Sequence, residues 1–230
     1  SEGEAKQSQI ALLFKVVGKG TLWLSQRRRG DKIDVLGPLG RGFSIEPNSR
    51  NLLLVAGGIG IAPLIFLAHH ASAQYKVTLI HGASTAAQLY PCSSLRAKRS
   101  NLLPLPDKVQ FIPVTEDGSM GKKGVVTDVL PHFLDWADQI YACGPVDMYK
   151  AMAEQTCHSE EEKRPKNLAQ DKLREELKLK KCQVSLEVRM GCGMGACYGC
   201  TINTKKGLKQ VCRDGPIFVL DEIIWEEVRI

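Results

Sequence analysis

Four cysteines near the carboxyl end of the chain have the spacing of iron–sulfur ligands. Cys192, Cys197 and Cys200 follow the pattern C-x4-C-x2-C, and Cys212 follows after eleven further residues. This is the plant-type [2Fe–2S] spacing, in which four thiolates bind two irons. Glycines between and beside the cysteines allow the backbone to take positive φ and to turn N–H groups toward the sulfurs. We therefore expect these four cysteines to hold a [2Fe–2S] cluster.

Two structural alternatives compete for the same cysteines. A zinc site prefers paired C-x2–4-C motifs, and only Cys197 and Cys200 form one. A pair of disulfides is the other alternative. Because the sequence shows no signal-peptide pattern, a cysteine cluster favours metal binding in a reducing compartment, and we expect a cytoplasmic protein. The other four cysteines share no spacing and are predicted to be free thiols: Cys92, Cys143, Cys157 and Cys182.

A glycine-rich turn in the first half of the chain could bind the pyrophosphate of a nucleotide. The apolar run Leu52–Ala56 is typical of a buried strand. The residues that follow it form the turn and the start of a helix, namely Gly57, Gly58, Gly60, Ala62 and Pro63. Such a turn presents N–H groups and a helix N-terminus to a pyrophosphate. The pattern is not G-x-G-x-x-G, so close packing of a helix on a strand is the alternative reason for the glycines.

Two further predicted strand ends carry small and polar residues. His81–Thr85 follows one strand, and Cys143, Gly144 and Pro145 follow another. Since ligands of open α/β sheets bind at the carboxyl ends of the strands, we expect these segments to complete a pyridine-nucleotide site. His81 itself is interpreted as a core or edge histidine. The choice between NADH and NADPH stays open, because the basic residues Arg96, Lys98 and Arg99 could meet a 2′-phosphate or face solvent.

The elements that must position these residues follow from the apolar pattern. Residues 10–45 resemble β structure, with strands at Ile10–Val17 and Asp31–Leu36 and a turn at Gly18–Gly20. From Asn51 strands and helices alternate, which predicts a parallel sheet with crossovers. The predicted strands are Leu52–Ala56, Lys76–His81, Val109–Thr115 and Gln139–Ala142, and the predicted helices are Ala62–Ala73, Val125–Phe133 and Val146–Thr156.

Composition and charge exclude several classes of protein. The net charge of +6 is mild and no basic stripe is interleaved with aromatic residues, so we expect no nucleic-acid partner. The uncharged stretch Leu52–Ala68 contains glycines and a proline and is short for a membrane span, so we expect no membrane partner. Ser159–Lys181 has 14 charged residues among 23, which is typical of a solvated helix or linker.

Together these motifs resemble the electron-transfer subunit of class B dihydroorotate dehydrogenase, within the ferredoxin–NADP reductase-like superfamily. The resemblance lies in segments that occur in family order, namely Val16–Thr21, Asp34–Gly40, Gly57–Leu64, Tyr141–Pro145, Gln183–Glu187, Cys192–Cys200 and Cys212–Pro216. It implies an α+β fold of several parts. These are a partial FAD-binding β-barrel at 1–48, an NAD-binding α/β domain with a parallel sheet at 49–158, a charged connector at 159–181 and a small [2Fe–2S] lobe at 182–230.

The resemblance also implies an oxidoreductase subunit of pyrimidine biosynthesis. Electrons pass between NAD(H), FAD and the [2Fe–2S] cluster, and then to an FMN-containing dihydroorotate dehydrogenase catalytic subunit in a heterotetramer. The subunit does not itself bind dihydroorotate, so no catalytic residue is assigned. A nicotinamide gives up two electrons and a [2Fe–2S] cluster accepts one at a time, so a flavin is also chemically required between them.

The positions that match the family's FAD contacts are Leu13, Phe14, Lys15, Gly20 and Thr21. The family's Arg-Pro-x-Ser strand is not found, and the chain begins at Ser1, so we expect a trimmed chain or a fragment that binds FAD weakly. Two alternatives remain. One is a related NAD(P)H-dependent flavin/iron–sulfur reductase subunit that feeds ferredoxin or a sulfur-metabolising partner. The other is a non-catalytic iron–sulfur module.

Overall fold

The computed structural model describes residues 10–90, 103–153 and 182–228. The chain divides into two compact units, Ser1–Val35 and Leu36–Ile230. The charged connector 159–181, the cysteines Cys92 and Cys157, and the basic residues Arg96, Lys98 and Arg99 lie outside the described residues. The boundaries proposed above for the four parts of the chain stay a prediction.

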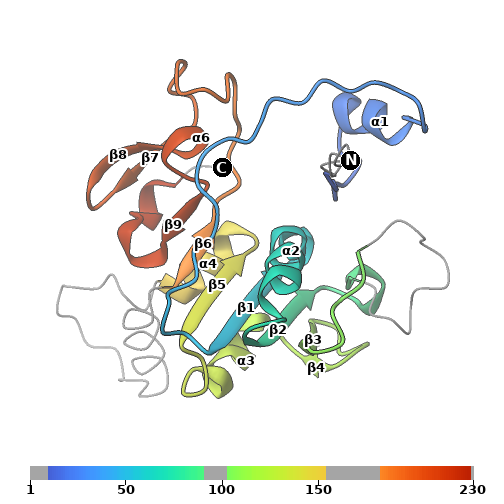
Figure 1. Ribbon diagram of the computed structural model, residues 1–230, viewed down its shortest axis with the longest axis vertical. Helices are drawn as coiled ribbons and strands as arrows, with labels where there is room; N and C mark the ends of the chain where they lie inside the picture. Colours follow the sequence, from blue (N-terminus) through green and yellow to red (C-terminus); the bar gives the residue numbers. More distant parts are fainter. Residues whose placement is uncertain (1–9, 91–102, 154–181, 229–230) are drawn as a thin grey trace, which may run out of the picture. The chain divides into compact units, whose positions relative to one another are not determined.

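A seven-stranded sheet forms the centre of the second unit (Figure 1). Its strands lie in the order β4-β3-β2-β1-β5-β6-β9. Their bounds are β1 Asn51–Gly57, β2 Lys76–Ala83, β3 Gln110–Thr115, β4 Lys122–Lys123, β5 Gln139–Cys143, β6 Gln183–Ser185 and β9 Ile217–Val219. All neighbours are parallel except β6 and β9, which pair antiparallel. The predicted parallel sheet is therefore confirmed, including the four strands expected from the apolar runs.

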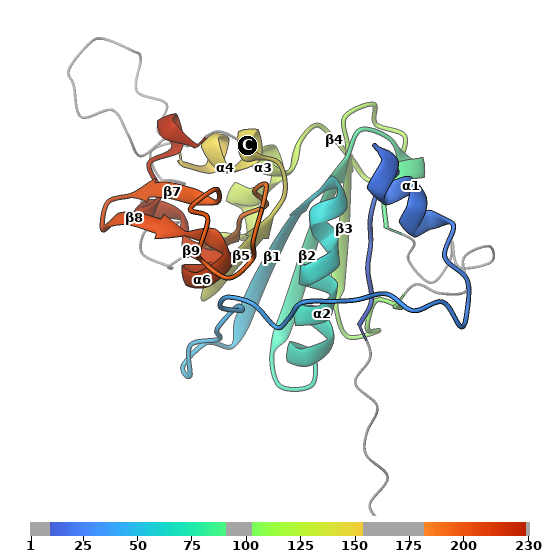
Figure 2. The ribbon, with the colours of Figure 1, turned by 90° about the horizontal axis from the view of Figure 1, so that it is seen from above.

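Side-chain alternation along β1 divides the core into two layers. Leu52, Leu54 and Ala56 pack against α2 (Ile61–Ala71), whereas Leu53 and Val55 belong to the cluster on the other face. Successive side chains of a strand point to opposite faces, so a strand buried on both faces must be apolar throughout. Figure 2 shows α2 on one face of the sheet and α3 and α4 on the other.

Short helices connect the strands. The 3-10 turn η1 (Gly58–Gly60) precedes α2, η2 (Ala86–Gln88) follows β2, and α4 (Val146–Ala153) follows β5. The helix expected at Val125–Phe133 is broken into α3 (Val126–Val129) and the 3-10 helix η4 (Leu130–Phe133). Pro131 explains the break, because proline has no N–H for the hydrogen bond that would continue an α-helix.

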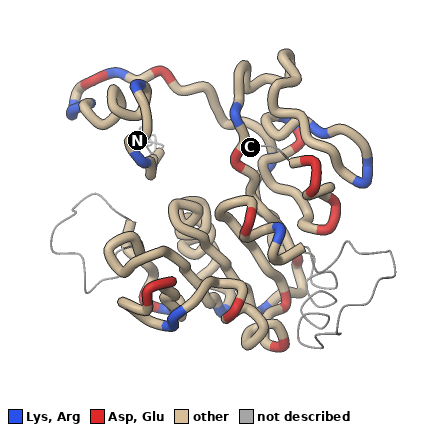
Figure 3. Tube along the Cα trace, turned by 180° about the vertical axis from the view of Figure 1, so that it is seen from behind, with Lys and Arg blue, Asp and Glu red and all other residues tan. Residues whose placement is uncertain are grey.

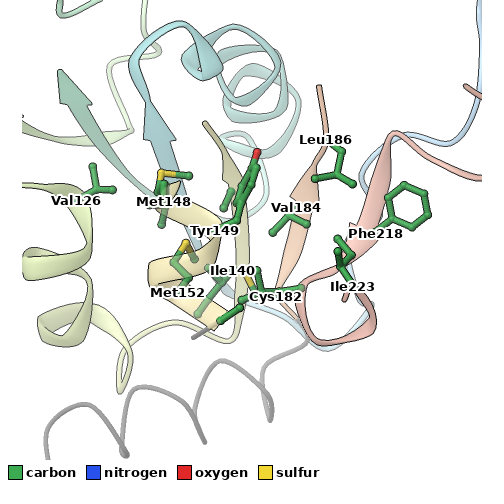
Figure 4. Packing of buried hydrophobic residues seen from close by; sticks show 14 of the residues in the cluster. Val126, Ile140, Met148, Tyr149, Met152, Cys182, Val184, Leu186, Phe218 and Ile223 are labelled. Atoms are coloured by element: carbon green, nitrogen blue, oxygen red, sulfur yellow. The ribbon is translucent and has the colours of Figure 1, made fainter. Parts of the chain in front are cut away.

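The described part of the C-terminal lobe comprises residues 182–228. β6 and β9 attach it to the main sheet, and β7 (Thr201–Thr204) and β8 (Gly207–Gln210) form an antiparallel hairpin. The lobe also contains α6 (Val211–Asp214) and the 3-10 turns η5 (Leu220–Glu222) and η6 (Trp225–Glu227). Figure 4 shows Val184, Leu186, Phe218 and Ile223 from this lobe beside Tyr149 and Met152 of α4, so the lobe shares one core with the sheet domain.

The prediction of strands in residues 10–45 is wrong. Ile10–Val17 and Asp31–Leu36 have no regular secondary structure, and the expected turn at Gly18–Gly20 begins the helix α1 (Lys19–Ser25). The Thr21 hydroxyl accepts the N–H groups of Val17 and Gly18 at 2.9 and 3.2 Å, which favours a helix start over a strand turn. A β-branched run becomes a strand only when another strand pairs with it, and among the described residues of the first unit no strand does so.

No described helix is long and apolar enough to cross a membrane. Acidic and basic residues are interspersed along the described trace (Figure 3).

Candidate iron–sulfur and nucleotide sites

The four cysteines lie in and around one glycine-rich loop of the C-terminal lobe. Cys192 and Cys197 are in the loop itself, Cys200 precedes β7, and Cys212 is in α6. Cys200 and Cys212 are buried, whereas Cys197 is exposed and Cys192 is half-buried. The hairpin brings Cys212 back to Cys200, because the N–H of Val211 donates to the Cys200 carbonyl at 3.1 Å. The structure thus brings together all four cysteines that the sequence predicts as ligands.

The thiols are arranged as two pairs. The Cys197 N–H donates to Cys192 Sγ at 3.4 Å, and the Cys212 N–H donates to Cys200 Sγ at 3.5 Å, so each pair of cysteines is adjacent. The charge of Cys192 also reaches Cys212, so the two pairs are neighbours. Among the described residues no three His, Cys, Asp or Glu side chains group as ligands of a single metal ion. A [2Fe–2S] cluster needs two thiolates at each of two irons, so two neighbouring pairs of thiols fit it.

Backbone N–H groups point at these sulfurs. The N–H groups of Ala196 and Cys197 donate to Cys192 Sγ at 3.3 and 3.4 Å, and that of Gly199 donates to Cys197 Sγ at 3.4 Å. The N–H groups of Cys197 and Met194 are the main reason that the pKa of the Cys192 thiol falls to about 6. The hydrogen bond with Cys200 raises the pKa of Cys212. Such donors favour thiolates and offset the negative charge of a bound cluster.

Glycines and one tyrosine give the loop its shape. Gly193 and Gly195 have φ of 71° and 82°, and Tyr198 has φ of 57°. A Cβ on Gly195 would lie 2.9 Å from the Gln210 side chain, whose amide donates to the Gly195 carbonyl. Positive φ is costly for residues other than glycine, so Tyr198 marks a constrained position beside the cysteines. Sequence reasoning did not single out Tyr198, because tyrosine carries no signal of positive φ.

The glycine turn after β1 packs tightly against the end of β5. A Cβ on Gly60 would lie 2.2 Å from the Cys143 carbonyl oxygen, and one on Gly57 would lie 2.6 Å from Pro145 Cδ. Gly144 is enclosed in the same way by Met148 and Gly57. The close-packing explanation therefore accounts for these three glycines. Gly58 is different: its φ is 54° and a Cβ there would meet nothing within 4 Å, so it faces open space.

His81 and Tyr149 hold the backbone of this crevice. Nε2 of buried His81 donates to the Gly58 carbonyl at 2.9 Å, and its Nδ1 accepts the N–H of Tyr90 at 3.2 Å. Burial is the main reason that the pKa of His81 falls to about 4. The Tyr149 hydroxyl accepts the N–H of Gly144 at 2.8 Å and donates to the Ser185 carbonyl at 2.6 Å. No local sequence signal identifies Tyr149, because its partner Ser185 lies 36 residues away in β6.

The nucleotide crevice and the cysteine loop originate at the same edge of the sheet. β1, β5 and β6 are parallel, with Ala56 opposite Cys143 and Cys143 opposite Ser185. The glycine turn leaves β1 at this edge, Gly144 and Pro145 leave β5, and the chain toward Cys192 leaves β6. Carboxyl ends of parallel strands form the ligand-binding edge of open α/β sheets. The predicted nucleotide residues of both strands are thus brought together, with Ala62 and Pro63 in the first turn of α2.

The five residues matched to flavin contacts lie in the first unit. Leu13, Phe14 and Lys15 are in a segment without regular structure, and Gly20 and Thr21 are in α1. They are not on a barrel strand, so the described residues do not reproduce the surface that the resemblance implies for FAD.

Two family models match the chain. The Oxidoreductase NAD-binding domain matches residues 54–154, which include the glycine turn and the end of β5. The Iron-sulfur cluster binding domain of dihydroorotate dehydrogenase B matches residues 187–224, which include all four paired cysteines.

Relatives align over nearly the whole chain. The "Dihydroorotate dehydrogenase B (NAD(+)), electron transfer subunit" of Caldanaerobacter subterraneus is 34% identical over 229 residues, which cover 98% of this chain and 79% of the relative. The protein of the same name from Bacillus caldolyticus is 36% identical over 225 residues, covering 95% of this chain and 76% of the relative. The chain thus spans between three-quarters and four-fifths of the length of these relatives.

A solved structure shares the fold. The NADH-dependent reduced ferredoxin-NADP oxidoreductase, whose structure is described with insights into flavin-based electron bifurcation, is 31% identical, with a TM-score of 0.69 over 93% of this chain and 68% of that one. The sequence identity to these relatives, and the share of their length that is matched, show which family the chain belongs to. This chain belongs to the electron transfer subunits of dihydroorotate dehydrogenase B.

Proposed function

We propose that this chain passes electrons between a pyridine nucleotide and the catalytic subunit of a dihydroorotate dehydrogenase, in pyrimidine biosynthesis. One observation carries the proposal: the glycine turn and the segment that leads to the paired cysteines leave the same edge of one parallel sheet. A nucleotide site and a metal site built on one rigid edge are suited to electron transfer. The chain is then an oxidoreductase subunit that does not itself bind dihydroorotate.

The four cysteines hold the metal site in this proposal. Cys192 and Cys197 bind one iron and Cys200 and Cys212 bind the other, as their pairing suggests. A [2Fe–2S] cluster, when bound, supplies one-electron transfer. The N–H groups of Ala196, Cys197 and Gly199 stabilise the thiolates and help to set the reduction potential.

The glycine turn binds the pyridine nucleotide. The N-terminus of α2 has no side-chain cap, and its first turn follows directly on η1. Backbone N–H groups at such a terminus favour a diphosphate. Gly57, Gly60, Cys143, Gly144 and Pro145 shape the crevice by their close contacts, and Gly58 provides its open side.

FAD completes the cofactor set of the family. When bound, it would supply the conversion of a two-electron hydride transfer into single-electron transfers. In this chain its contacts are proposed at Leu13, Phe14, Lys15, Gly20 and Thr21, whose arrangement off a strand favours weak binding.

The partner subunit docks on the exposed apolar residues around the cysteine loop. Tyr198 and Met194 are 70% and 67% exposed, and Met190 is 45% exposed. Tyr198 adjoins the exposed Cys197, so a partner that covers it comes close to the cluster. Exposed aromatic residues and methionines are enriched at protein interfaces. We infer a heterotetramer with an FMN-containing catalytic subunit in the cytoplasm, where a reducing environment keeps the six described cysteines free.

Co-purification tests this partner surface. Tyr198→Asp should weaken association with the catalytic subunit by about tenfold or more, because a carboxylate would be buried in an apolar contact. Aspartate tolerates positive φ better than most residues, so the loop and its visible absorption should persist. Phe66→Asp is the matched control, since Phe66 is 71% exposed on α2 and is expected to leave association intact. Unchanged association of Tyr198→Asp would refute the surface.

A related reductase is the second candidate, because the structural neighbour at TM-score 0.69 is a ferredoxin-NADP oxidoreductase. Such a subunit would feed ferredoxin or a sulfur-metabolising partner. NADH-driven reduction of ferredoxin that is faster than electron exchange with dihydroorotate through the catalytic subunit would favour it. Absence of NADH-dependent dye reduction when FAD is supplied would instead favour a non-catalytic iron–sulfur module.

A further inference from the structure

We propose that His81 is a positioning residue for pyridine-nucleotide binding and that it acts through the peptide between Gly58 and Ile59. The inference rests on the proposed nucleotide site, but it gives a role to a residue that neither the resemblance nor the glycine pattern assigns. His81 is in β2, opposite Ala56 of β1, which immediately precedes the glycine turn.

Both ring nitrogens of His81 are used by backbone groups. Nε2 is 2.9 Å from the Gly58 carbonyl oxygen, and Nδ1 is 3.2 Å from the N–H of Tyr90. Because Nδ1 accepts, the neutral ring must carry its proton on Nε2 and donate it to Gly58. The side chain is fully buried, so water cannot replace this donor. The Ile61 N–H also donates to the Gly58 carbonyl, so His81 and the start of α2 together fix its direction.

The direction of that carbonyl determines where the next N–H points. The peptide between Gly58 and Ile59 is trans, since the cis peptides of the described chain are Gly37–Pro38 and Gly215–Pro216. In a trans peptide the C=O and N–H point in opposite directions, so the Ile59 N–H points away from His81.

Gly58 also allows a ligand to approach. Its φ of 54° is the left-handed conformation that glycine accepts without strain, and a Cβ there would meet no atom within 4 Å. Successive N–H groups around such a residue form a concave anion site. By holding the Gly58 carbonyl inward, His81 presents the Ile59 N–H to the diphosphate of the nucleotide.

Two amide variants separate positioning from simple core filling. Glutamine places its N–H donor the same number of bonds from Cβ as histidine Nε2, so His81→Gln should keep the contact with Gly58. Asparagine is one carbon shorter and should lose it. Thr78→Val is the control on the same strand: Thr78 is also buried and donates to Gln110 Oε1 at 3.1 Å, away from the turn.

Dissociation constants for NADH, ADP-ribose and adenosine, measured on the 230-residue chain by titration calorimetry, test the proposal. We expect His81→Asn to weaken NADH and ADP-ribose by about tenfold, and His81→Gln by less than about threefold. Adenosine has no diphosphate, so its affinity should change by less than about twofold in every variant. Thr78→Val should bind all three ligands as the wild type does.

Several results would overturn the inference. Equal affinity of His81→Asn and wild type for ADP-ribose would show that the contact does not position the diphosphate. Equal losses for adenosine and ADP-ribose, or loss of the fold in both amide variants, would reduce His81 to a structural residue. A wild-type chain that binds neither NADH nor ADP-ribose would contradict the proposed nucleotide site itself, which is a different failure.

Discussion

At the scale of single residues, the cysteines were predictable and their pairing was not. The spacing of Cys192, Cys197, Cys200 and Cys212 identifies them in the sequence because four thiolates must reach two irons from one loop. Which thiols pair depends on the hairpin that returns Cys212 to Cys200, and local sequence does not specify that contact. The role proposed for His81 has no local sequence signal for the same reason, since its partner Gly58 lies on another element.

Replacing Cys197 by Ser should abolish the visible absorption of the cluster. Anaerobically purified wild type should contain two irons and two acid-labile sulfides per chain, as a [2Fe–2S] cluster requires. Cys182→Ala is the matched control, because Cys182 is a buried thiol of the core whose pKa is raised by burial. It should keep the absorption. Zinc in place of iron and sulfide in the wild type would contradict the assignment.

The buried His81 should make stability depend on pH. Its pKa is about 4 in the folded chain against 6.5 when unfolded, so the unfolded chain binds more protons between these values. The stability that the folded chain gains while His81 is neutral is fully present above pH 6.5 and is lost as the pH falls toward 4. Between pH 7 and pH 5 the loss should be about 2 kcal/mol.

Urea unfolding should be measured at both pH values for the wild type and for His81→Gln. The comparison separates the pH dependence due to His81 from that due to other titrating groups. The variant should lose less stability than the wild type over this interval. Parallel behaviour of the two proteins would mean that His81 is not held neutral by burial.

At the scale of elements, apolar periodicity predicted the sheet because its strands are buried on both faces. Every residue of Leu52–Ala56 is apolar. Alternate side chains of this strand pack against α2, and the others pack against α3 and α4. The same reasoning failed for Ile10–Val17, since a strand is defined by its neighbour as well as by its own residues. Pro131 was a visible signal of the break between α3 and η4 that the helix prediction ignored.

Substitution of Gly60 by Val should destabilise the fold rather than block nucleotide binding alone. The new Cβ would lie 2.2 Å from the Cys143 carbonyl, so β5 and the turn must separate, at a cost of about 3 kcal/mol. Gly58→Ala meets open space and costs only about 1–2 kcal/mol from its positive φ. Thermal melting should therefore rank Gly60→Val well below Gly58→Ala. The reverse order would show that the turn is not packed as described.

Tyr149 links the nucleotide edge to the C-terminal lobe. Tyr149→Phe removes the hydroxyl between Gly144 and Ser185 and leaves both backbone groups without this partner. We expect a loss of about 1–3 kcal/mol in the free energy of unfolding. The Tyr149 ring, whose centroid is 5.3 Å from that of Trp225, remains in the variant. Unfolding by urea therefore measures the effect of the hydroxyl alone. An unchanged midpoint would show that water replaces it.

At the scale of the whole molecule, FAD should be held weakly by this chain. The residues matched to its contacts lie outside any strand, so the ring would be poorly oriented toward the nicotinamide. Orientation in such a transfer is worth about 7–11 kcal/mol when fully exploited. Gel filtration after incubation with FAD should return a chain that keeps the visible absorption of its cluster but carries almost no flavin. A chain that retains one FAD and oxidises NADH rapidly would contradict this expectation.

Reduction of the cluster by dihydroorotate tests the central claim most directly, because it requires the paired cysteines and the partner but not FAD. The anaerobic chain is mixed with the catalytic subunit, dihydroorotate is added, and the visible absorption of the cluster is followed. We predict rapid bleaching when the catalytic subunit is present, none when it is omitted, and slower bleaching with Tyr198→Asp. A cluster that stays oxidised beside an active catalytic subunit would contradict the account.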